Sequence, residues 1–145
     1  MSAKSFVDTN ILVYSFDTAD PFKQQIAVEL MLGLWRSGQG VLSLQVLKEF
    51  FVTVTLKLAV RMTYDDARSA IEDFCTWECV EENKDSLLLA MDLSRRYTLS
   101  FWDANIVASA VRSGCEICYS EDMSSGQVYE GVTIVNPFLG KEVQS

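Results

Sequence analysis

The chain has 145 residues, of which 49% are hydrophobic and 22% charged. This composition is typical of one globular domain and excludes a disordered chain. The net charge of −8 argues against a broad, nonspecific grip on nucleic acid, which needs a basic surface. No basic leader precedes a long apolar run, and no apolar stretch approaches the roughly 18 residues of a membrane span. We therefore expect a cytoplasmic protein with no membrane partner.

The first half of the chain alternates short apolar runs with helical patterns. Thr9 or Asn10 is placed to cap a first helix, and Pro21 suits the first turn of a second. We predict strands at 5–8 and 40–43 and helices at 9–16, 21–36 and 44–60.

The same alternation continues to the end. Thr63 precedes Asp66 by three residues, an arrangement like a capping box that predicts a helix start. We predict an edge strand at 75–80, helices at 83–97 and 100–113, strands at 116–120 and 132–135, and a turn at 124–126. Strands that alternate with helices predict a parallel sheet covered on both faces. We expect one domain over residues 1–137 and a short exposed tail over 138–145.

Four acidic residues lie near the predicted ends of elements. Asp8 ends the first strand, and Asp122 follows the strand at 116–120. Glu49 lies early in the helix after strand 40–43, and Asp103 lies in the first turn of the helix that leads into strand 116–120. Ligands bind beyond the carboxyl ends of parallel strands, so these carboxylates should share one rim. Because the chain has no histidine, hydrolysis at this rim would depend on carboxylates that hold hard divalent cations.

Each of these residues also has a purely structural interpretation. Asp8 could only cap the following helix, and Asp103 could form a capping box with Ser100. Asp122 could make an Asx-turn, and Glu49 could be a solvated surface residue.

Three polar neighbours have two interpretations as well. Asn10 and Ser120 could orient carboxylates or bound water, or could only satisfy backbone groups at element ends. Glu121 is expected at the surface, with the alternative that it replaces Asp122 as a ligand.

The four cysteines lie in CTWEC (75–79) and CEIC (115–118). Their spacing weakly suggests zinc, but their apolar contexts favour packing. Nothing indicates a secreted protein, so we expect no disulfides.

At this point the residues resemble a known family. The segments FVDTNILVYSFD (6–17), QVLKEFFVTVT (45–55), FWDANIVASA (101–110) and SEDMSSGQ (120–127) resemble the four acidic motifs of PIN-domain ribonucleases, and most of all VapC-type toxins. The resemblance extends from Phe6 to about Pro137. It implies a three-layer α/β/α sandwich with a central parallel sheet of about five strands.

The resemblance also implies metal-dependent cleavage of RNA with Mg²⁺ or Mn²⁺. By position, Asp8, Glu49, Asp103 and Asp122 match the acidic quartet. Thr9 and Asn10 match the polar pair after the first aspartate, and Ser120 matches the small hydroxyl residue two before the last. Asp8 would be the central ligand, Asp103 and Asp122 would complete the sites, and Glu49 would bind one ion or orient water.

The implied partners are an RNA substrate, a cognate antitoxin and a second copy of the chain. Apolar segments 32–35 and 50–54 could supply those surfaces or could be core. Trp102 could stack on a base or be buried.

Two other functions stay open. One is a phospho-acceptor or phosphatase α/β domain, although Asn10 stands where such phosphatases need a second aspartate, and no lysine follows the late strands until Lys141. The other is a noncatalytic module that binds RNA or protein.

Overall fold

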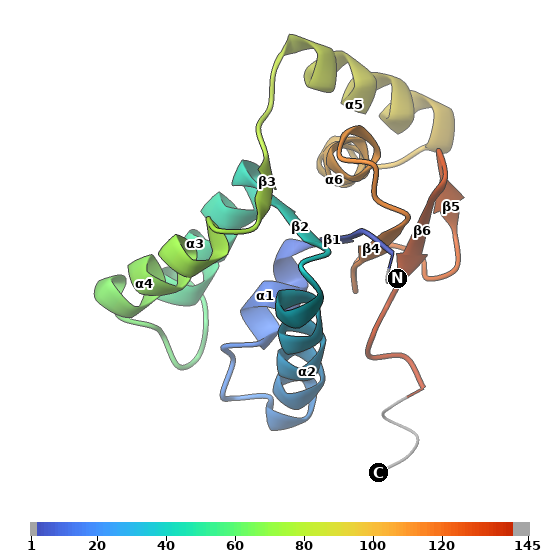
Figure 1. Cartoon of the computed structure of the whole chain (residues 1–145). Helices are drawn as coiled ribbons and strands as arrows, with labels where there is room; N and C mark the ends of the chain where they lie inside the picture. The colour runs from blue at the N-terminus through green and yellow to red at the C-terminus, as the bar shows by residue number, and fades with distance from the viewer. Residues whose placement is uncertain (1–2, 141–145) are drawn as a thin grey trace.

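The computed structural model describes residues 3–140, and its centre is a six-stranded sheet with the order β3-β2-β1-β4-β6-β5 (Figure 1). All neighbouring strands are parallel except β5 and β6. The strands are β1 Ser5–Val7, β2 Gly40–Ser43, β3 Glu78–Val80, β4 Ile117–Tyr119, β5 Val128–Tyr129 and β6 Val132–Val135.

Helices cover both faces of the sheet, which confirms the predicted three-layer α/β/α sandwich. In Figure 1, α1 and α2 lie on one side of the sheet, and α5 and α6 lie on the other. Helix α3 packs against α1 and β2, and α4 packs against α3. The helices are α1 Thr9–Tyr14, α2 Pro21–Ser37, α3 Leu44–Leu56, α4 Tyr64–Phe74, α5 Lys84–Tyr97 and α6 Phe101–Arg112.

The prediction of about five strands missed β5. This strand has two residues and pairs antiparallel with β6 through a tight turn at Glu130 and Gly131. Both turn residues have positive φ, 52° and 84°, as a two-residue type I′ hairpin requires. Two residues are too few for a strand pattern to show in the sequence.

Two predicted elements were too long. Helix α3 ends at Leu56 instead of residue 60, because the amides of Lys57 and Leu58 both bond to the Thr53 carbonyl and close the helix. Strand β3 begins at Glu78 instead of residue 75, because the amides of Thr76 and Trp77 still bond to carbonyls of α4.

The expected exposed tail begins with a buried residue. Phe138 is 1% exposed, and its ring meets Tyr14 edge to face at a centroid distance of 5.1 Å. Residues 141–145 of that tail lie outside the described residues, and the domain boundary at residue 137 stays a prediction. Within residues 3–140, no helix has the length and apolar character needed to cross a membrane.

Strand β1 lies where the direction of the sheet reverses. From β1 the chain continues outward through β2 and β3, and then returns to add β4 on the other side of β1. Phe6, Val7 and Cys118 in these two central strands are fully buried. At such a reversal, open α/β sheets bind ligands in the crevice outside the carboxyl ends of the strands, which here are the ends of β1 and β4.

Candidate active site

Asp8 lies at the carboxyl end of β1 and starts α1. Its amide donates to the Tyr119 carbonyl of β4 at 2.9 Å, and its Oδ1 accepts from the Thr9 amide at 2.7 Å. Asp8 itself is therefore the N-cap of α1, and the prediction that Thr9 or Asn10 caps this helix was wrong. The second oxygen of this carboxylate, Oδ2, takes no part in capping and accepts hydrogen bonds from other side chains.

Polar side chains from both central strands meet at that second oxygen. Asp8 Oδ2 accepts from Ser120 Oγ at 2.8 Å and from Asn10 Nδ2 at 3.4 Å. Asn10 Nδ2 also donates to Asp122 Oδ2 at 3.0 Å, while Asn10 Oδ1 accepts from the Glu121 amide at 3.1 Å. One amide side chain thus links the ends of β1 and β4 and brings Asp8 and Asp122 together.

Asp8 is the most perturbed carboxyl of this group. It is 6% exposed, and its pKa is raised from 3.8 to about 6. Burial is the largest cause of the raised pKa, and the charges of Asp122 and Glu49 add to it, while the Ser120 and Thr9 hydrogen bonds oppose it. Desolvation therefore contributes more to the raised pKa of Asp8 than repulsion between the carboxylates does.

Glu49 is exposed at the edge of the crevice. Its Oε1 accepts from Gln45 Nε2 at 2.9 Å and lies 3.5 Å from Thr9 Oγ1. Its charge acts on Asp8, so the structure places Glu49 near the same strand end. Asp122 is exposed as well.

A network of side-chain hydrogen bonds connects Glu49 to helix α6, and it was not predicted from the sequence. Asn105 of α6 is 3% exposed, and its Nδ2 donates to Gln45 Oε1 at 2.7 Å and to Glu82 Oε1 at 3.0 Å. The network continues from Gln45 to Glu49. A signal was available in the sequence, because Asn105 is a polar residue within the very apolar run ANIVASA.

Replacement of Asn105 by alanine should lower the free energy of unfolding by about 1–3 kcal/mol, because it removes the partner of two polar groups and leaves a void. Urea denaturation measures this change. The exposed residue Gln127, replaced by alanine, is the control and should have little effect. Equal stability of the two variants would contradict a structural role for the network.

Asp103 lies in the first turn of α6, where its amide donates to Ser100 Oγ at 3.1 Å. A full capping box would also need the Asp103 side chain to accept from the Ser100 amide, and the described residues show no such bond. The half-buried Asp103 carboxylate is therefore not used for capping. Burial is the main cause of the raised pKa of the Cys118 thiol, and the charges of Asp8 and then Asp103 contribute to it. Helix α6, which carries Asp103 in its first turn, packs against β1 and β4.

Glu121 is directed away from the other carboxylates. It forms an ion pair with Lys23 and accepts a hydrogen bond from Tyr14 Oη at 2.9 Å. Its side chain is 25% exposed and therefore lies partly buried at the surface. Because its carboxylate is already paired, Glu121 does not fit the alternative role of replacing Asp122.

The donor set suits a hard cation, although it is not assembled in advance. Within residues 3–140, no three side chains of the metal-binding types lie close enough together to hold a metal ion. Asp8 and Asp122 nevertheless share one amide nitrogen as their donor, so a single cation in that region can reach both after small side-chain movements. Carboxylate oxygens are the ligands that Mg²⁺ and Mn²⁺ prefer.

The cysteines give no support for zinc. All four are free thiols; Cys115 and Cys118 are buried, and Cys75 is exposed. No disulfide forms among the described residues.

The geometry defines an α/β protein whose acidic and amide side chains gather at the switch point of a parallel sheet. Residues 5–125 match the model of the PIN domain, so the chain belongs to the PIN-domain family, which confirms the resemblance. A comparison with curated proteins gives no sequence match.

Two solved structures are similar in fold. One is a toxin–antitoxin complex from Klebsiella pneumoniae, with 22% identity and a TM-score of 0.67, where the match covers 92% of this chain and 97% of the other. The other is VapC20 of Mycobacterium tuberculosis, a toxin that cleaves the sarcin–ricin loop, with 20% identity and a TM-score of 0.63. This second match covers 81% of this chain and 89% of VapC20.

Proposed function

We propose that this protein is a metal-dependent endoribonuclease and the toxin of a toxin–antitoxin pair. The observation that carries the proposal is the meeting of Asp8 and Asp122 on Asn10, at the switch point of a PIN-domain sheet. The neighbouring fold of VapC20, an RNA-cleaving toxin, supports the same activity. Because its substrate would be cellular RNA, we propose a cytoplasmic location.

In this proposal Asp8, Asp103, Asp122 and Glu49 hold Mg²⁺ or Mn²⁺. The ions would supply an activated water and would neutralise charge on the leaving oxygen. Hydrogen bonds hold the Asp8 amide to the Tyr119 carbonyl and the Asp8 carboxylate to the Ser120 hydroxyl, so Asp8 is the pre-positioned ligand in this proposal. The exposed carboxylates of Asp122 and Glu49 can turn toward it. Thr9 and Asn10 orient these side chains.

Saturating Mn²⁺ should raise the melting temperature of the purified protein by several degrees. A ligand at one hundred times its dissociation constant stabilises the folded state by about 2.7 kcal/mol, which shifts the melting temperature of a domain of this size by about 9 °C. Differential scanning fluorimetry with Mn²⁺ or EDTA measures the shift, and RNA cleavage should stop in EDTA. An unchanged melting temperature at saturating Mn²⁺, together with cleavage in EDTA, would rule out the metal site.

The partner proposals have some support at the surface. Leu32 and Trp35 on α2 are 48% and 46% exposed and line an apolar groove of about 270 Å³ with Phe74 of α4. In the second predicted segment, Phe50 and Val54 are core residues. We propose that an antitoxin binds this chain and that the chain forms a homodimer. The fold of the Klebsiella toxin–antitoxin complex supports the antitoxin.

Growth of bacteria that express the chain tests the toxin role. Expression of the parent alone should arrest growth, whereas expression of Asp8→Asn at the same level should not. Arrest by both forms would show that toxicity does not depend on nuclease activity. Light scattering of the purified chain gives its oligomeric state.

The other two functions lose support. Asp8 is buried and engaged by Ser120 and Thr9, which suits a ligand better than a phospho-acceptor. The acidic quartet is complete in the sequence, which a module that only binds RNA would not need.

A further inference from the structure

A cavity lined by Glu49 lies next to the proposed metal site. It has a volume of about 670 Å³ and lies between the first turns of α3, the link from β3 to α5, and the start of α6. Glu49 belongs to both the cavity and the proposed metal site, so a nucleotide next to the bond that is cut can reach this space. Volumes of this size hold small ligands.

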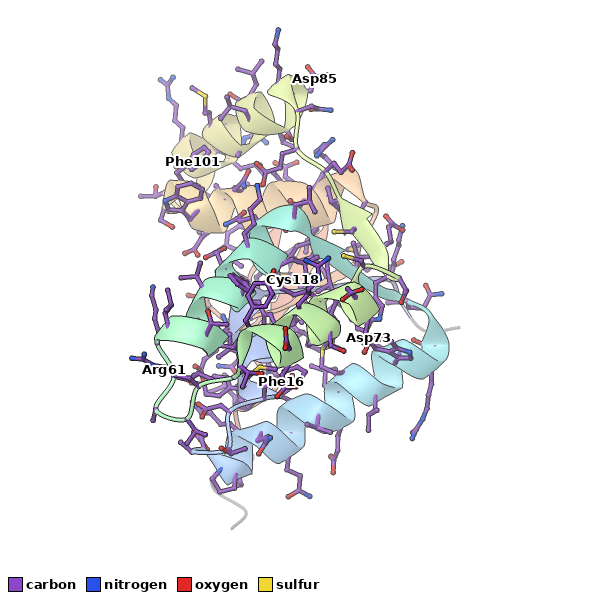
Figure 2. All side chains as sticks on the ribbon, turned by 90° about the vertical axis from the view of Figure 1, so that its left-hand side faces the viewer. Phe16, Arg61, Asp73, Asp85, Phe101 and Cys118 are labelled. Atoms are coloured by element: carbon purple, nitrogen blue, oxygen red, sulfur yellow. The ribbon has the colours of Figure 1, made fainter. Side chains whose placement is uncertain are left out.

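An aromatic side chain forms one wall of this cavity. Trp102 is 64% exposed, and it immediately precedes Asp103, a proposed metal ligand. Its ring meets Phe101 edge to face, with centroids 5.2 Å apart, and Figure 2 shows Phe101 at the outer end of α6, below α5. This contact leaves most of the indole surface exposed. Exposed indoles are stacking platforms for unpaired bases.

The polar groups of the cavity suit the hydrogen-bonding edge of a base better than a phosphate. Three carboxylates, Glu49, Glu81 and Glu82, line it with one ammonium, Lys48. An excess of negative charge repels phosphate and attracts N–H donors.

Among these carboxylates, Glu82 is held in place and still accessible. Its Oε1 accepts from the buried amide of Asn105 at 3.0 Å, yet the residue is exposed. A carboxylate has about four acceptor positions, so Glu82 retains free ones. Guanine presents two adjacent donors, N1–H and the N2 amino group, that match two carboxylate oxygens. Adenine and cytosine present one amino group on their pairing edges. Uracil presents a single N–H between two acceptors.

We propose that this cavity is a base-binding subsite, in which Trp102 stacks on an unpaired nucleobase and Glu82, held by Asn105, selects guanine. The order of preference is guanine first, adenine and cytosine next, and uracil last. The assignment rests on the proposed function, because the bound base belongs to the RNA that the metal site would cut.

Fluorescence titration separates this subsite from catalysis. The probes are four RNA pentamers, UUXUU, in which X is guanine, adenine, cytosine or uracil and every 2′-hydroxyl is methylated. In the parent protein, the guanine pentamer should quench indole fluorescence and bind about tenfold tighter than the uracil pentamer. Trp102→Ala should weaken binding of the guanine pentamer by about tenfold, read by competition with a labelled pentamer. Trp102→Phe should restore most of this affinity, because phenylalanine also stacks.

Glu82→Gln tests base selection. Glutamine removes the paired acceptors but can still accept from Asn105, so the preference for guanine should fall to threefold or less while the uracil pentamer binds as before. The matched control is Glu29→Gln on α2, which does not line the cavity, and it should change neither affinity nor preference. Thermal melts verify that all variants are folded.

Different outcomes separate the two proposals. If the parent cuts RNA but Trp102→Ala and Glu82→Gln bind all pentamers like the parent, the subsite is wrong and the nuclease proposal stands. If base selection follows Trp102 and Glu82 but no RNA is cut, the subsite stands and the nuclease proposal fails. If an arginine-containing peptide quenches Trp102 and requires Glu82, while the pentamers show no base preference, the cavity binds a cationic side chain of a protein instead.

Discussion

Replacement of Asp8 by asparagine should lower the rate of RNA cleavage by about 10³-fold or more. The change keeps the shape of the side chain but removes the charge of the proposed central ligand, and metal-ion catalysis contributes several kcal/mol to such reactions. A fluorogenic RNA substrate with Mg²⁺ in excess measures the rate.

A matched substitution keeps this result interpretable. Asp85→Asn changes an exposed aspartate at the start of α5, which is labelled in Figure 2 and does not belong to the candidate active site. It should retain the parent rate within about twofold. Full activity in Asp8→Asn would remove Asp8 from the catalytic site, whereas equal losses in both variants would indicate a general effect on the fold.

The pH dependence of stability should change strongly when Asp8 is replaced. The Asp8 pKa is about 6 in the folded protein and 3.8 in the ordinary, solvated state. Well below pH 3.8 the carboxyl is neutral in both states and does not affect the free energy of unfolding. As the pH rises from about 4 to 6, Asp8 ionises in the unfolded chain before it ionises in the folded protein, so the free energy of unfolding falls. Above pH 6 this loss reaches about 3 kcal/mol.

The measurement compares denaturation curves of the parent and Asp8→Asn in EDTA at several pH values. Asparagine cannot ionise, so the difference in unfolding free energy should move by about 3 kcal/mol in favour of Asp8→Asn between pH 4 and 7. Subtraction of the two curves removes the titration of all other groups. A difference that stays constant with pH would show that the Asp8 carboxyl is not desolvated in the folded protein.

The elements with strong local signals were predictable from the sequence. Thr63 caps α4 and accepts from the Asp66 amide at 3.1 Å, as its spacing predicted. The buried strands β1 and β2 were found because they are short apolar runs before caps. Strand β5 and the burial of Phe138 depend on contacts with distant residues, which no local pattern reports.

In the candidate active site, too, some features could be predicted from the sequence and others depend on distant contacts. The positions of Asp8 and Asp122 followed from topology alone, because parallel strands end at one edge. The bridging amide of Asn10, the pairing of Glu121 with Lys23 and the support of Glu82 by Asn105 are side-chain choices among several possible partners. Such choices depend on distances that only the folded chain sets.

The bridge made by Asn10 has a consequence for cells in which metal is scarce. Its amide protons, with the hydroxyl of Ser120, give the clustered carboxylates donors of their own. Under the proposed function, the fold would therefore persist without a cation, and the metal-free protein would be folded and inactive. If the proposed metal site is correct, an arriving ion would compete with the Asn10 amide for these carboxylates, so that cleavage would begin only above a threshold of metal concentration.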